Sequence, residues 1–251
     1  QTLADSFRKM IGVDLDEQKK WSGHQKILKN WKEKIESIGI FVLQHSIPKD
    51  SVSAFSVVDK KPYVIMLNSH EHENRRIFSL FHEIGHIFLQ QSGICTPDNF
   101  SRNAHSYIHV EKFCNAFASN LLVPTDDFKN NLKVLELKDK KFEDWSNDKV
   151  RAVANQYGVS QEVIYRKFVS VGFLSEKVYE QKRGELMKGF VEYQKRKKPG
   201  GPVPQHWQIL GKNGKAYSGL VLDSYKTNKI TMTDAADFLG TNTQHLKAVA
   251  D

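Results

Sequence analysis

The sequence has few cysteines, no long apolar run and no excess of acidic charge. Its 251 residues include only two cysteines, Cys95 and Cys114, which are too few for a disulfide framework. No apolar run approaches the ~18 residues of a membrane span, and no secretory leader stands at the N-terminus. These absences predict a soluble, cytoplasmic protein with no membrane partner, in which both cysteines are reduced and serve as small apolar fillers.

The charge balance is basic, with 37 Lys and Arg against 29 Asp and Glu and a formal net charge of +8. Such a charge permits nucleic acid or acidic proteins as partners. Lysine is also common on ordinary solvated helices, so the charge alone does not select a function.

Periodicity and turn residues predict a small sheet among helices. A long amphipathic helix is expected over residues 16–38, because apolar residues recur there at helical spacing and Gly39 follows. The expected strands and the two main helices lie at residues 40–44, 53–58, 63–67, 74–91 and 109–123.

The sequence of the second half of the chain predicts a helical extension and a separate C-terminal module. Two short helices around Gly158 resemble a helix-turn-helix. A basic segment ending in "KRKK" and the breaker "PGGPVP" read as a linker. We predict a main domain over residues 1–180, a basic helical linker over 181–204 and a small C-terminal module over 205–251.

The stretch "RIFSLFHEIGHIFLQ" places three ionisable residues in an apolar helix. His82 and His86 are four residues apart, so both imidazoles lie on one helix face and can reach one ion. Glu83 beside them completes the pattern H-E-x-x-H, in which the glutamate takes a proton from water and does not bind the metal. Burying these groups without partners is costly, which predicts a Zn²⁺ site with Glu83 as the catalytic base. Gly85 costs about 1 kcal/mol of helix stability relative to Ala, so we expect a close approach there by a second backbone or a ligand.

A catalytic zinc site needs a third protein ligand, and Glu111 is the best placed. Positions 111, 114, 118 and 122 share one helix face, which directs this carboxylate toward the core. The alternative is a first-turn glutamate favoured by the helix dipole.

Other polar residues near the motif have alternative roles. His105 and His109 are rival metal ligands, whereas His70 and His72 are expected at the surface of a charged loop. Asn115 either orients a ligand or makes a routine helix hydrogen bond.

The segments "NRRIFSLFHEIGHIFL" and "EKFCNAFASNLLVP" together resemble the ImmA/IrrE family of zincin-like metallopeptidases. That family typically shows a strand ending in Asn, an Arg-Phe-containing helix with H-E-x-G-H, and a helix of the form E-x-x-x-N-x-F-A-x-x-L-L-x-P. All three features occur here, with Asn68 as the strand residue. The resemblance is specific over residues 53–125 and looser over 16–52 and 126–251.

The resemblance implies a zincin-like α+β fold, with a small sheet packed on the HExxH helix, a helical extension and a small C-terminal module. It implies that His82, His86 and Glu111 bind zinc and that Glu83 is the general base. The implied activity is an endopeptidase that cleaves a regulatory protein, a helix-turn-helix transcriptional repressor, in a bacterial or phage stress, mobile-element or toxin–antitoxin context. Many long members carry an N-terminal helix-turn-helix that would precede Gln1 and bind DNA, so we expect a truncated chain.

Two other classes of function remain open from the sequence. The helix pair around Gly158 and the positive charge fit a DNA-binding regulator with a non-catalytic zinc site, although Gln161 and Arg166 are the only obvious base-reading side chains. The same helix pair also fits a lid packed on the peptidase domain. An antitoxin-like partner-binding protein would need the fold without hydrolysis. The strand over residues 63–67 either pairs with an extended substrate as a sheet edge or belongs to the sheet core.

Overall fold

A computed structural model describes residues 2–48, 52–90, 94–95, 105–196, 201 and 203–250. These residues form a mixed α+β structure of helices α1 to α14, one short 3-10 helix and a small sheet, which confirms the predicted fold class. Contacts divide the chain into two compact units. One unit comprises Gln1–Ile27 with Asn115–Gly200, and the other comprises Leu28–Cys114 with Gly201–Asp251. The predicted domain boundaries at residues 180 and 204 stay a prediction.

The sheet lies in the second unit and has the strand order β1-β3-β2-β4. Its strands are β1 (Phe41–His45), β2 (Ala54–Val57), β3 (Val64–Asn68) and β4 (Ile94–Cys95). β3 pairs in parallel with β1 and antiparallel with β2. Of the two roles predicted for this strand, sheet core is confirmed and a substrate-pairing edge is wrong, because both of its sides are already paired.

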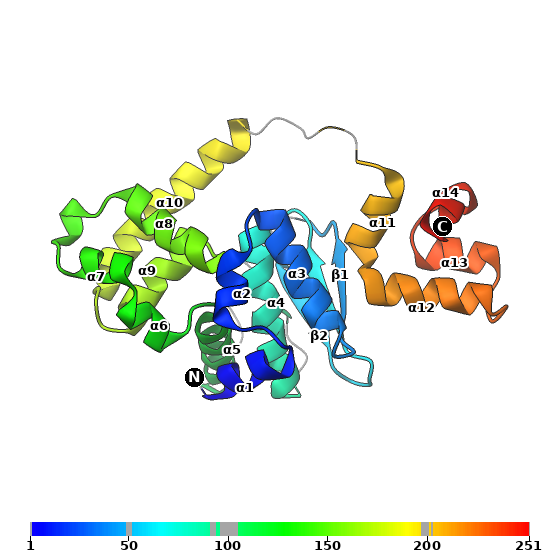
Figure 1. Ribbon diagram of the computed structural model, residues 1–251, viewed down its shortest axis with the longest axis horizontal. Helices are drawn as coiled ribbons and strands as arrows, with labels where there is room; N and C mark the ends of the chain where they lie inside the picture. The colour runs from blue at the N-terminus through cyan, green and yellow to red at the C-terminus, as the bar shows by residue number, and fades with distance from the viewer. Residues whose placement is uncertain are drawn as a thin grey trace. The chain divides into compact units, whose positions relative to one another are not determined.

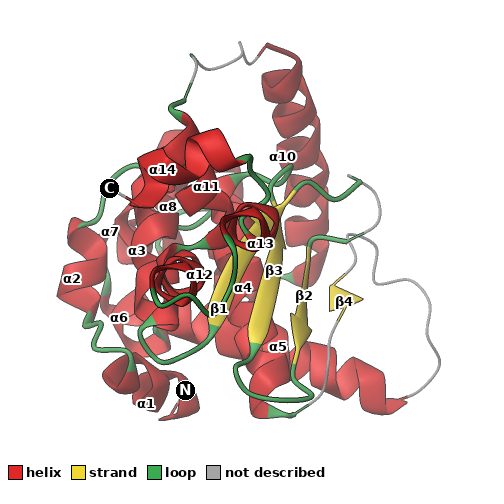
Figure 2. Ribbon diagram, turned by 90° about the vertical axis from the view of Figure 1, so that its right-hand side faces the viewer, coloured by secondary structure: helices red, strands yellow, loops and turns green. Residues whose placement is uncertain are grey.

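Helix α4 (Glu73–Phe88) packs against β2 and β3 across one face of the sheet (Figure 2). Its apolar residues are buried, and Phe81 meets Trp31 of α3 (His24–Glu36) edge to face with ring centroids 4.8 Å apart. This aromatic contact packs α3 against α4 and so helps to fix the helix that carries the H-E-x-x-H motif.

The long helix expected over residues 16–38 is instead two helices. α2 (Leu15–Lys20) ends before Trp21, which has an extended backbone, and α3 begins after Gly23, whose φ is +82°. A left-handed residue cannot continue an α-helix, so the chain turns at Gly23 although the apolar periodicity runs through it.

The C-terminal helices form their own small core. They are α11 (Gln205–Asn213), α12 (Lys215–Lys226), α13 (Met232–Phe238) and α14 (Thr243–Ala250). The buried residues at their centre are Ile209, Val221, Ala235, Leu239 and Leu246. α11 lies alongside β1 in Figure 1 and contacts it, so α11 joins these helices to the sheet at its edge strand.

Charged side chains of α3 bind the corner between α11 and α12. Lys32 Nζ donates to the Gly211 carbonyl oxygen at 2.9 Å, near the C-terminal end of α11. Glu36 Oε2 accepts from the backbone N–H groups of Lys215 and Ala216 at 3.0 and 3.2 Å, in the first turn of α12. A cation thus lies at a helix C-terminus and an anion at a helix N-terminus, which is the favourable arrangement for both helix dipoles.

The first unit is helical. Its remaining helices are α1 (Thr2–Met10), α6 (Thr125–Asn130), α7 (Leu132–Lys138), α8 (Asn147–Tyr157), α9 (Gln161–Ser170) and α10 (Glu176–Arg196). The buried Gln18 amide joins distant segments by donating to the carbonyls of Leu122 and Tyr157 at 2.9 and 2.7 Å. In the described part of the chain, no helix combines the length and the apolar character needed to cross a membrane.

Candidate metal centre

Helices α4 and α5 (His105–Leu122) bring three predicted ligands together. His82 Nε2 lies 3.2 Å from His86 Nε2. The two Glu111 oxygens lie 3.3 Å from these same nitrogens, Oε2 facing His82 and Oε1 facing His86. All three side chains are buried. The helical spacing of four residues sets the histidine pair, and α5 supplies the carboxylate from the predicted buried face.

The distances within this cluster fit a shared metal ion. Two ligands bound about 2.0–2.1 Å from one tetrahedral zinc ion are about 3.3 Å apart, which matches all three separations. A direct ion pair would be closer, at about 2.7–2.9 Å. In addition, three atoms of the cluster have no hydrogen-bond partner of good geometry among the described residues. They are both Glu111 oxygens and His86 Nδ1. Buried polar atoms left in this way are costly, so the residues present suit a cation.

The electrostatics of Glu111 agree with a ligand that remains ionised. Burial raises the pKa of this carboxyl, but the neighbouring imidazoles of His82 and His86 outweigh burial and lower the pKa to about 2. Glu111 is thus a carboxylate at any pH at which the protein would bind a metal.

Cys114, which was predicted to be only an apolar filler, is a further metal-ligand candidate. Its Sγ and nitrogens of His82 and His86 all lie within 4.8 Å of one another. Its position one helical turn after Glu111 was the sequence feature that could have identified it as a candidate ligand. The Glu111 oxygens lie 3.3 Å from nitrogens of both histidines, so Glu111 and Cys114 are both within reach of the histidine pair.

Cys114 also explains the glycine in the motif. A Cβ added at Gly85 would lie 2.9 Å from both the Cα and the Sγ of Cys114. The expected close approach of a second backbone is confirmed, since α4 and α5 cross here with no room for a side chain.

Glu83 is fully buried beside this cluster, and one of its two carboxylate oxygens is hydrogen-bonded. Its Oε2 accepts a hydrogen bond from Ser56 Oγ at 2.7 Å, whereas its Oε1 has no hydrogen-bond partner among the described residues. Burial raises the pKa of Glu83, and the Ser56 hydrogen bond and the two histidines offset only part of that increase. Sequence reasoning missed Ser56 because it lies 27 residues before Glu83 on another element.

The other polar candidates lie apart from the buried cluster. His109 and Asn115 are exposed on α5, and His70 is exposed after β3. His72 caps the N-terminus of α4 by accepting from a backbone N–H. His105 is the first residue of α5, and its side chain lies outside the described part of the chain.

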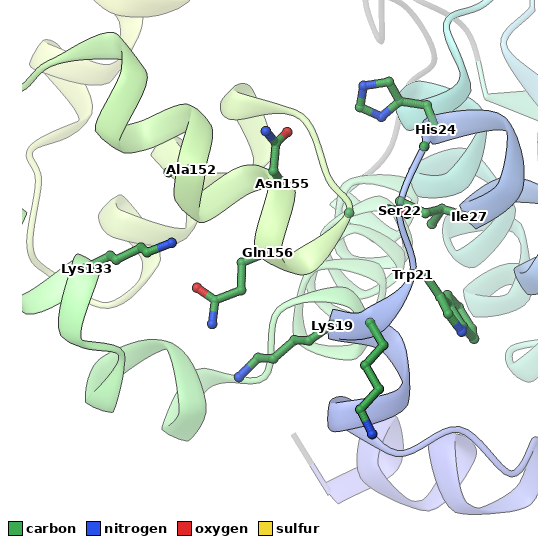
Figure 3. A pocket seen from close by; sticks show the side chains of 12 residues that line it. Lys19, Trp21, Ser22, His24, Ile27, Lys133, Ala152, Asn155 and Gln156 are labelled. Atoms are coloured by element: carbon green, nitrogen blue, oxygen red, sulfur yellow. The ribbon is translucent and has the colours of Figure 1, made fainter.

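A pocket of about 560 Å³ lies in the first unit (Figure 3). Its walls come from the end of α2, the start of α3, and helices α7 and α8. Figure 3 shows Lys19, Lys133 and Gln156 on these walls. Among the residues that the structure describes, no carboxylate lines the pocket, so it shows no set of metal ligands comparable to the α4–α5 cluster.

Comparison with known proteins agrees with the geometry. The sequence profile of the IrrE N-terminal-like domain, peptidase family M78, matches residues 35–168. That segment includes β1 to β3, α4 and α5, and therefore every residue of the buried cluster. No curated protein gives a significant match. The chain belongs to the IrrE N-terminal-like family of metallopeptidases.

Proposed function

We propose that the protein is a zinc-dependent endopeptidase, with His82, His86 and Glu111 as metal ligands and Glu83 as the general base. The observation that carries this proposal is the cluster of three side chains whose facing nitrogen and oxygen atoms are separated by 3.2–3.3 Å, beside a buried carboxylate with one free oxygen. Zinc at such a site supplies an activated water and polarises the carbonyl group that is attacked.

Glu83 would carry the proton during hydrolysis. Its free Oε1 takes a proton from the attacking water as the water oxygen bonds to the carbonyl carbon. The same oxygen then gives the proton to the leaving amine as the carbon–nitrogen bond breaks. The raised pKa of this buried carboxyl favours the uptake of the proton.

We propose a helix-turn-helix transcriptional repressor as the substrate, in a bacterial or phage stress or mobile-element response. Support comes from the resemblance of the two motif helices and from membership of a peptidase family. A protein substrate requires a flexible segment at the cleavage point, because a segment held in a folded domain cannot bind in the site as a free extended chain.

The contacts of α9 favour a peptidase over a DNA-binding regulator. The Arg166 guanidinium lies 4.5 Å from the centroid of the Tyr179 ring and pairs with Glu176 at 3.4 Å. Glu162 pairs with Arg183 at 3.3 Å. These contacts tie α9 to α10 and engage Arg166, one of the two side chains that could read a base edge.

Metal content tests the ligand set. Plasma mass spectrometry on protein purified without added metal should give about one zinc per chain in the wild type and in His109→Ala, the exposed control on α5. His82→Ala and Glu111→Ala should lose the zinc. Zinc retained in Glu111→Ala, or absent from the wild type after zinc is added back, would contradict the site.

Cleavage of a proteome-derived peptide library tests the activity. The zinc-loaded wild type should produce new peptide ends, and Glu83→Gln should produce none while keeping its zinc. Glu71→Gln, which alters a carboxylate outside the cluster, is the control and should cleave as the wild type does. Cleavage by Glu83→Gln at the wild-type rate would reject Glu83 as the base.

A further inference from the structure

A serine occupies the centre of the buried face of β2, directly under the H-E-x-x-H helix. Ala54 and Ser56 point toward the interior with almost no exposed surface, and Val57 faces outward and is exposed. An apolar residue is typical at such a position, because β2 packs against α4. Ser56 instead places a hydroxyl 2.7 Å from Glu83 Oε2.

Because of this hydrogen bond, the two oxygens of Glu83 have different environments. Oε2 is held by a donor on the sheet, while Oε1 is buried and has no partner among the described residues. A carboxylate fixed at one oxygen loses its freedom to rotate, so its other oxygen keeps one direction. The sheet is a rigid support, since β2 is paired with both β3 and β4.

We propose that Ser56 is a positioning residue, which aims the free oxygen of Glu83 at the metal centre through its hydrogen bond to the other oxygen. This inference rests on the proposed function. It assigns to β2 a direct part in the site, in addition to its packing on α4.

A purely structural role makes a different prediction. If Ser56 only satisfies a buried carboxylate, its loss should affect stability and nothing else. The chain offers a matched control on the same segment. Ser53 is also buried, and its Oγ donates to a Glu71 oxygen at 3.1 Å, outside the metal cluster. Ser53→Ala therefore removes an equivalent serine–glutamate bond without touching Glu83.

The test uses acetohydroxamate, which binds zinc through two oxygens and shares its hydroxyl proton with an adjacent general base. Calorimetry on the full, zinc-loaded chain measures its affinity for the wild type and for Ser56→Ala, Ser56→Thr, Ser53→Ala and Glu83→Gln. Zinc content and Tm are measured on the same samples. Thr keeps the hydroxyl, so Ser56→Thr is the conservative rescue.

We expect Ser56→Ala to bind acetohydroxamate about tenfold more weakly while keeping its zinc, because a charge-assisted hydrogen bond that sets geometry is lost. Ser56→Thr and Ser53→Ala should bind within about twofold of the wild type. In the double variant with Glu83→Gln, Ser56→Ala should cause no further loss, since the two residues act as one unit.

Two results would overturn the inference, and they differ in what else they overturn. Unchanged hydroxamate affinity in Ser56→Ala, with Glu83→Gln clearly weakened, would reject the positioning role and leave the peptidase proposal intact. A wild-type chain that takes up no zinc would overturn the proposed function and the role of Ser56 with it.

Discussion

Lys167 shows how individual buried charges are stabilised in this chain outside the metal centre. Its side chain is 1 % exposed, and its Nζ donates to Asn120 Oδ1 at 2.8 Å and to Thr125 Oγ1 at 2.9 Å. Burial lowers the pKa of Lys167 to about 8, although the charge of Asp126 opposes the decrease. The ammonium therefore lies among neutral acceptors and ties α9 to the junction between α5 and α6.

Lys167 should make the free energy of unfolding increase with pH in the alkaline range. The pKa is about 8 in the folded chain and about 10.4 in the unfolded chain. At pH values between these two, Lys167 is protonated in the unfolded chain and neutral in the folded chain. The free energy of unfolding should therefore rise by up to about 1.4 kcal/mol per pH unit. Urea unfolding of the wild type and Lys167→Met, repeated from neutral to alkaline pH, measures this as a growing difference. Parallel curves for the two proteins would show that Lys167 keeps an ordinary pKa.

Gly85 should be intolerant of even the smallest side chain. Alanine at this position would meet the Cys114 backbone at 2.9 Å, so α4 and α5 would have to separate. We expect Gly85→Ala to lower the free energy of unfolding by about 1–3 kcal/mol and to weaken zinc binding. Gly184→Ala in α10 is the control, because nothing lies within 4 Å of its added Cβ. That control should gain up to about 1 kcal/mol from helix propensity. Equal effects of the two substitutions on unfolding would show that the helix crossing is not tight.

At the level of secondary structure, the corner between α11 and α12 is shaped to fit α3. Gly214 joins the two helices with φ +71°, and a Cβ there would meet Glu36 Oε1 at 1.8 Å. α12 has no N-cap side chain of its own, so Glu36 supplies the acceptor that its first turn needs.

Gly214→Ala should release this corner from α3. The substitution combines an unfavourable positive φ with a clash against the carboxylate, and we expect a loss of about 2 kcal/mol or more. Gly219→Ala, within α12 and with open space around its Cβ, should cause no loss. Hydrogen exchange of the α11 and α12 amides measures the effect. Unchanged protection in Gly214→Ala would show that Glu36 does not hold the corner.

Local sequence patterns predicted the two helices that carry the proposed ligands, whereas contacts between segments far apart in the sequence could not be predicted. The spacing of His82 and His86 and the buried face of Glu111 are properties of single helices, so the sequence contains them. Ser56 lies near Glu83 only because β2 pairs with β3 under α4. No short sequence pattern specifies that strand order. The helix break at Gly23 was missed for a related reason, since apolar periodicity continues on both sides of it.

At the scale of the whole molecule, one unit contains all the residues of the proposed chemistry. The sheet, α4 and the start of α5 lie in the segment Leu28–Cys114, and the C-terminal helices pack in the same unit. The three proposed metal ligands are buried and therefore lie in the folded core of that unit. Metal binding and folding should be coupled there, because an unfolded chain cannot hold the three donors together.

This coupling predicts a stabilisation by zinc that depends on Glu111. Free zinc at 1,000 times its dissociation constant should raise the free energy of unfolding by about 4 kcal/mol, and a chelator should remove that gain. Thermal unfolding with zinc or chelator measures the shift in Tm for the wild type, Glu111→Ala and His109→Ala. The shift should vanish in Glu111→Ala and persist in His109→Ala, whose imidazole is exposed on the same helix. A full zinc-dependent shift in Glu111→Ala would instead point to the two histidines with Cys114, the other donor within 4.8 Å, as the set that binds the ion.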